Sequence, residues 1–162
     1  MTPRARALAF GALTVGTLDM LDAIVFSAFR GVAPLRVPQS IAAGLLGRAA
    51  FAGGPWTALA GLAIHYCIAS SVVAVYFLAS RRLPSLSRHA LLFGPLYGLL
   101  VWVVMNYVVI PLSAITMPPL TAARLINGLG IHALGVGLPS ALFARAANQA
   151  SGLPPRRGVE VG

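Results

Sequence analysis

The residues of this sequence that could do chemistry are polar side chains embedded in long apolar stretches. A carboxylate, an imidazole or an amide is unfavourable in the middle of a lipid bilayer, so such residues usually pair with one another or mark a pathway. Two of the three acidic residues of the whole chain lie in one such stretch. The candidates are Asp19, Asp22, His65, Asn106, Asn127 and His132.

The spacing of these residues predicts that they meet. Asp19 and Asp22 are three residues apart, which places both carboxylates on one face of a helix. His65 and His132 each end a Gly-Leu-X-Ile-His pentapeptide, a weak internal repeat. At a rise of about 1.5 Å per residue, both histidines and Asp19 lie about 15 Å from the same boundary, near the bilayer midplane. The other candidates lie closer to that boundary, so we expect one inward-facing polar cluster.

Three interpretations of this cluster remain open. The first is a hydrogen-bonded network that only fixes helix packing. The second is a pathway for protons or a solute, because Asp and His side chains are the usual parts of proton relays. The third is a metal or haem site at His65 and His132, although no tight H-x-x-H or E-x-x-H spacing supports it.

No catalytic motif accompanies the cluster. The sequence has no G-x-S-x-G, no H-E-x-x-H and no glycine-rich phosphate loop. Cys67 is the only cysteine, so an internal disulfide and a cysteine-rich metal motif are both excluded. We therefore expect that the protein is not an enzyme and holds no cofactor, with the two histidines as the ligands of a metal if there is one.

The elements that must position these residues follow from the composition. The chain has 162 residues, of which 58% are hydrophobic and 9% charged, whereas a soluble domain has about 25% charged residues. Four apolar runs explain the difference, and each is long enough to span a bilayer as a helix, which takes about 20 residues. The sequence predicts an all-α membrane protein with a four-transmembrane-helix bundle at about 7–29, 56–80, 90–112 and 122–144.

The connection between the first two spans is long and not plainly polar. Prolines 34 and 38 interrupt it, and residues 39–52 then have the pattern of a short helix that is too short to span. Such a helix would lie in the interface as an amphipathic helix or dip into the bilayer as a re-entrant one. We expect one transmembrane domain over 1–147 and a disordered cytoplasmic tail over 148–162.

Small residues and prolines predict how the spans pack. Gly94 and Gly98 form a small-xxx-small pair, which lets a second helix approach closely. Pro139 lies inside the last span and should kink it.

The net charge of +9 comes from arginine alone. These arginines stand at the ends of apolar runs rather than on a basic helix, so we expect contacts with anionic lipid headgroups and no binding of nucleic acid. Eight arginines belong to one side and four to the other, and the richer side belongs to the cytoplasm. Both termini are therefore expected in the cytoplasm, with the connection over 31–55 outside. The richer side holds Arg4, Arg6, Arg81, Arg82, Arg88, Arg145, Arg156 and Arg157, and the other holds Arg30, Arg36, Arg48 and Arg124.

Several short motifs resemble those of the YagU-like family of uncharacterised bacterial inner-membrane proteins. They are His65 followed by Ile-Ala-Ser at 68–70, Pro-Leu-Ser at 111–113 followed by two prolines at 118–119, and His132 in the last span. The resemblance covers roughly residues 56–143. It implies a small helical protein of the bacterial inner membrane that is loosely tied to acid resistance.

Together these observations predict an integral inner-membrane protein with an Asp/His cluster at mid-depth, which serves proton-linked transport or acid handling. The alternative is a structural or partner-binding membrane protein whose cluster fixes helix packing. Four helices leave little room for a solute channel, so transport would favour a homo-oligomer.

Overall fold

The computed structural model describes residues 1–116 and 119–150, and every regular element in these ranges is a helix. In chain order they are α1 (Pro3–Ala28), α2 (Arg36–Leu46), the 3₁₀ helix η1 (Gly47–Ala52), α3 (Gly54–Arg82), α4 (Pro84–Arg88), α5 (Ala90–Val104), the π turn η2 (Met105–Val109), α6 (Ala122–Ile131), the π turn η3 (His132–Gly137) and α7 (Leu138–Gln149).

Four helical segments are long and apolar enough to cross a membrane, as the sequence predicts. They are Pro3–Ala28, Gly54–Arg82, Ala90–Val109 and Ala122–Gln149. Many of their leucines face outward, such as Leu91 at 72% and Leu100 at 56% exposure. Exposed apolar surface of this extent is unfavourable in water but normal against lipid. The chain is therefore a multi-pass membrane protein.

The ends of these helices differ from the predicted ends by a few residues. The first helix begins at Pro3, because the Thr2 hydroxyl accepts a hydrogen bond from the Ala5 amide at 3.2 Å and caps it. The last helix continues to Gln149, so Asn148, which we expected in the tail, is helical. The Asn148 amide donates to the Ser80 and Ser87 hydroxyls at 2.9 and 3.1 Å, and these bonds hold the end of α7. The rest of the predicted tail, residues 151–162, lies outside the described residues.

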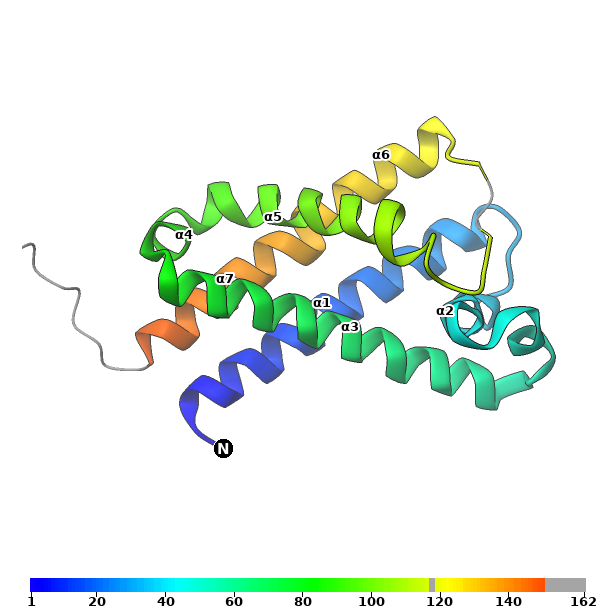
Figure 1. Ribbon diagram of the computed structural model, residues 1–162, viewed down its shortest axis with the longest axis horizontal. Coiled ribbons are helices and arrows are strands. Elements are labelled where there is room, and N and C mark those ends of the chain that lie inside the picture. The colour runs from blue at the N-terminus through cyan, green and yellow to red at the C-terminus, as the bar shows by residue number, and fades with distance from the viewer. Residues whose placement is uncertain (117–118, 151–162) are drawn as a thin grey trace, which may run out of the picture.

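The chain reverses direction between successive spans, so its described ends lie at one end of the molecule. Figure 1 shows the N-terminus, α4 and the end of α7 at this end, and α2 and the start of α6 at the other. We call these the α4 end and the α2 end. Arg4 and Arg81 both lie over the Phe77 ring, at 5.8 and 5.9 Å from its centroid, which joins α1 to α3 at the α4 end.

Glycines let α5 lie directly against η3, as Gly94 and Gly98 predict. A Cβ at Gly98 would overlap the carbonyl oxygen of His132, and a Cβ at Gly94 would lie 2.9 Å from the Leu138 Cα. Gly137 completes the contact from the other side, since its own Cβ would overlap the Gly94 carbonyl. The prediction of close packing here is confirmed.

The predicted irregularity at Pro139 lies before the proline rather than at it. Pro139 has no N–H group, so the preceding turn cannot keep the α-helical pattern of hydrogen bonds. The chain widens into the π turn His132–Gly137, and the Ser140 hydroxyl bonds the Val136 carbonyl at 2.7 Å. π turns of this kind are frequent at functional sites.

The segment from α2 to η1 lies against the start of α3. The buried Gln39 amide donates to the Gly54 carbonyl at 3.0 Å, and Gly61 leaves no room for a Cβ beside the Pro38 carbonyl. The Ala114 amide also donates to the Gly44 carbonyl at 2.8 Å, which ties the connection after α5 to α2. These bonds fix α2 over one end of the spanning helices.

Candidate functional site

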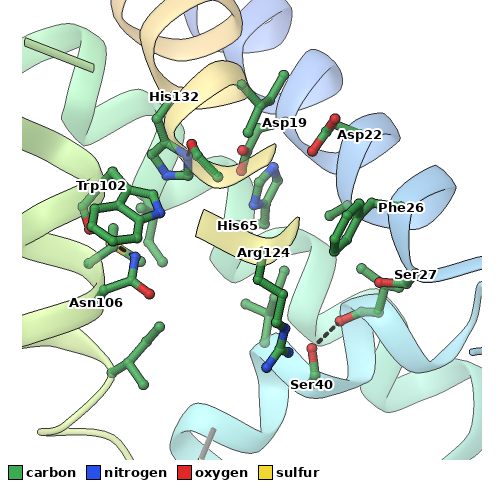
Figure 2. Close-up of a pocket in the computed structure, with 18 of the residues that line it drawn as sticks. Asp19, Asp22, Phe26, Ser27, Ser40, His65, Trp102, Asn106, Arg124 and His132 are labelled. Carbon is green, nitrogen blue, oxygen red and sulfur yellow. Dashed lines mark hydrogen bonds between the residues drawn. The ribbon is translucent and has the colours of Figure 1, made fainter. Parts of the chain in front are cut away.

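A cavity of about 1000 Å³ lies among α1, α2, α3, α5 and α6. Figure 2 shows polar side chains from several of these helices around it. The structure brings all six sequence candidates to its wall: Asp19, Asp22, His65, Asn106, Asn127 and His132.

His65 is the most enclosed of the six, with 8% of its surface exposed. Its Nε2 lies 2.8 Å from the Gly16 carbonyl oxygen of α1. A carbonyl can only accept, so Nε2 carries the proton and Nδ1 is left as an acceptor. The ring also meets the Tyr66 ring edge-to-face at 5.6 Å. His65 therefore joins α3 to α1 and keeps one basic nitrogen.

Asp19 follows Gly16 by three residues on the same helix, so its carboxylate lies close to the contact made by His65. It is half-buried. In Figure 2 its carboxylate lies between the labelled imidazoles of His65 and His132 and points to the same open space. Within 1–116 and 119–150 no direct hydrogen bond joins an aspartate to a histidine. The hydrogen bond that His65 does form goes to the Gly16 carbonyl of the same helix as Asp19.

Asp22 has a different partner from Asp19. The Asn127 amide donates to its Oδ2 at 2.7 Å, and this bond joins α1 to α6. A charge-assisted bond of this kind is short and strong, and it satisfies a carboxylate that would otherwise be costly at this depth. The two aspartates, alike in sequence, thus have separate environments.

Asn106 and His132 lie in the two π turns. The Asn106 amide donates to the Trp102 carbonyl at 2.9 Å, and His132 Nδ1 lies 3.0 Å from the Gly128 carbonyl. Each bond joins two residues of the same helical segment, four positions apart. For His132 the carbonyl requires a proton on Nδ1, so Nε2 is left as the acceptor of a ring that lines the cavity. His65 and His132 thus have opposite tautomers, although their pentapeptides match.

The closed end of the cavity points toward α4. Val15, Ala69 and Val136 line it there and belong to one buried apolar cluster with Val73. Val15 lies one helical turn from Asp19, Ala69 one turn from His65, and Val136 one turn from His132. In each pair the apolar residue is the one nearer to α4. The cavity widens in the opposite direction, where its lining residues Arg48 and Thr116 are exposed. Exposed side chains therefore line the cavity toward the α2 end, and buried apolar side chains line it toward the α4 end.

Sequence reasoning missed three arginines in the cavity wall. Arg36 of α2, Arg48 of η1 and Arg124 of α6 all line the cavity, whereas their positions beside apolar runs indicated only membrane orientation. For Arg36 and Arg48 the signal that could have found them is the apolar character of the connection over 31–55, which favours folding against the helices over extension into water. Trp102 and Phe26 also line the cavity and were not singled out.

The described residues bring no group of three or more His, Cys, Asp or Glu side chains close enough to hold a metal ion. His65 and His132 would need a further ligand from elsewhere to form such a site.

Comparison of the chain with protein-family models, with curated proteins and with solved structures gave no match.

Proposed function

We propose that this protein is a bacterial inner-membrane four-helix bundle that exchanges protons, or a solute linked to protons, through its polar cavity. The observation that carries the proposal is that all six polar candidates line one cavity. Polar side chains at this depth are energetically unfavourable in a membrane, so several of them around one cavity indicate a function. Acid handling, which the resemblance to YagU-like proteins implies, is one form that this activity takes.

Orientation in the membrane follows from the arginines. The α4 end holds six of the described arginines, namely Arg4, Arg6, Arg81, Arg82, Arg88 and Arg145, and the α2 end holds four. The positive-inside rule assigns the α4 end, and with it both termini, to the cytoplasm. The cavity then faces the outside, and α2 serves as a short amphipathic helix over its entrance.

The proton-exchanging groups in this proposal are Asp19, His65 and His132. Each histidine keeps one basic nitrogen, and Asp19 forms no hydrogen bond with another described residue. Asp22 and Asn127 act as positioning residues, since their hydrogen bond already satisfies the carboxylate. For a proton to pass to the cytoplasm, the side chains of Val15, Ala69 and Val136 must move apart. The helices α5 and η3 contact one another through glycines, so they could slide past each other to allow this movement.

The test is proton flux in proteoliposomes under an imposed pH gradient. Asp19→Asn and His132→Gln remove the proposed proton-exchanging groups with little change of shape, so each should abolish flux while the melting temperature changes little. His89→Gln is the matched control, because His89 is exposed in the α4 region and does not line the cavity. A wild-type protein with no flux above empty liposomes at acid and neutral pH would refute the proposal.

The second candidate function is a structural or partner-binding role in which the polar groups only fix helix packing. The bond between Asp22 and Asn127 specifically favours it, because that bond joins helices 105 residues apart in sequence. In that case all cavity substitutions change stability and none changes flux.

A further inference from the structure

The wide end of the cavity carries positively charged side chains. Arg36, Arg48 and Arg124 line it from three different elements. Arg124 already donates a hydrogen bond to the Pro119 carbonyl at 3.4 Å. Arg36 and Arg48 form no ion pair with any residue in 1–116 or 119–150, and Arg36 lies over the Phe51 ring at 5.3 Å. These two arginines are therefore the candidates for binding an anion at this end.

Among the described residues, few acidic side chains lie near Arg36 and Arg48. The chain has only three acidic residues, and the two that line the cavity lie deeper, on α1. One of them, Asp22, is already bonded to Asn127. A concave site with low-dielectric walls focuses the field of its charged groups, so this entrance attracts anions. Arginine is also the side chain best suited to bind a carboxylate or a phosphate with two hydrogen bonds.

The walls beside the arginines are apolar and partly aromatic. Phe26 of α1, Phe51 of η1 and Ile115 of the α5–α6 connection line the same cavity. Pockets that combine apolar walls with a few polar groups bind small organic molecules, with the polar groups fixing their orientation. At about 1000 Å³ the cavity is at the upper limit for such sites. A bare inorganic ion would leave most of this surface unused.

We propose that the cavity binds an organic anion, with its carboxylate or phosphate group at Arg36 and Arg48 and its apolar body against Phe26 and Phe51. The inference deepens the proposed function, on which it rests, by naming the chemical class of the solute. The proton-exchanging groups at the closed end then lie beyond the apolar body of the bound anion. The anionic group belongs either to a small soluble acid or to a membrane lipid, since both present the same chemistry to the arginines.

The test is calorimetric binding of benzoate to the full chain in phosphatidylcholine nanodiscs. Benzamide has the same shape without the charge, so we expect it to bind about tenfold more weakly or worse. The double variant Arg36→Gln/Arg48→Gln should weaken benzoate binding by about tenfold or more, because each lost guanidinium removes a charge-assisted hydrogen bond. The variant Arg36→Lys/Arg48→Lys keeps the charge and should recover part of the affinity.

Arg88→Gln is the control. Arg88 is exposed in the α4 region and does not line the cavity. We expect this variant to bind benzoate as the wild type does, within about twofold, because a change outside the cavity acts only through the screened long-range field. Equal binding of benzamide and benzoate would overturn the inference, as would an equal loss of affinity in Arg88→Gln and in the double variant.

Replacing phosphatidylcholine by phosphatidylglycerol distinguishes the two sources of the anion. A site for lipid headgroups loses benzoate affinity as the anionic lipid increases, and the double glutamine variant removes this competition. A site for a soluble acid keeps its benzoate affinity in both lipids. Proton flux measured without benzoate separates this inference from the proposed function: flux without benzoate binding overturns the anion site alone, and benzoate binding without flux overturns proton exchange alone.

Discussion

At the scale of single residues, the cavity separates side chains that look equivalent in the sequence. Asp22 is held by Asn127 at 2.7 Å, whereas Asp19 faces the open cavity near both histidines. His65 bonds a carbonyl of another helix, whereas His132 bonds one in its own. The groups that are satisfied across helices stabilise the fold, and the groups that keep an available polar atom are the ones suited to proton exchange.

The bond between Asp22 and Asn127 leads to a stability prediction. Asn127→Ala leaves the Asp22 carboxylate without its donor, so the free energy of unfolding should fall by about 1–3 kcal/mol. Thermal unfolding in detergent measures the change. Asn106→Ala is the control, since Asn106 bonds only within its own helix and keeps no partner across helices. A smaller loss in Asn127→Ala than in Asn106→Ala would show that the α1–α6 bond contributes little.

At the scale of elements, two π turns carry Asn106 and His132 to the cavity wall. Each turn precedes a proline by a few residues, Pro111 in one case and Pro139 in the other. The missing N–H group of proline disrupts the helical hydrogen bonds before it, and the widened turn redirects the side chains there. The glycines of α5 then fit against the exposed backbone of η3, with Gly98 directly on the His132 carbonyl.

This contact predicts a large effect of a side chain at Gly98. Gly98→Leu would force α5 away from η3, and overpacking of this kind costs about 1–3 kcal/mol or more, so the melting temperature in detergent should fall clearly. Gly130→Leu makes the same change on α6 where nothing lies within 4 Å, so it should leave the melting temperature nearly unchanged. Equal melting temperatures for the two variants would mean that α5 does not pack on η3.

At the scale of the whole molecule, a cavity of about 1000 Å³ lies within a single chain. The segments α2 and η1 fold over the α2 end and add a fifth wall to it. A cavity is not a channel through the membrane, so the expectation that transport favours a homo-oligomer stays a prediction.

Orientation is the prediction at this scale. Reporter fusions at Ser85 and at Gly162 should be cytoplasmic, and a fusion at Gly44 should be external, because the arginine-rich α4 end stays inside. Paired reporters that are active on opposite sides of the membrane measure this directly. A cytoplasmic reporter at Gly44 would mean that α1 does not span or that the molecule is inverted, and the cavity would then face the cytoplasm.

Helix class and depth could be predicted from the sequence because they depend on local properties. An apolar run of sufficient length forms a spanning helix whatever its neighbours are, since lipid requires internal backbone hydrogen bonds. A rise of about 1.5 Å per residue then fixes the depth of each polar group. Polar groups at a common depth avoid lipid by facing inward. For these reasons the sequence by itself brought Asp19, His65 and His132 to one place.

The tertiary structure alone decided which of these groups pair and what else reaches the cavity. Pairing depends on the rotation and crossing of helices far apart in the chain, such as those of Asp22 and Asn127. No local pattern contains that information, because many rotations bury the same apolar area. The path of a connection also depends on contacts with distant residues. The sequence therefore indicates only a role in membrane orientation for Arg36 and Arg48, whereas the fold of α2 and η1 places both in the cavity wall. The positive entrance that distinguishes this cavity is therefore a property of the fold.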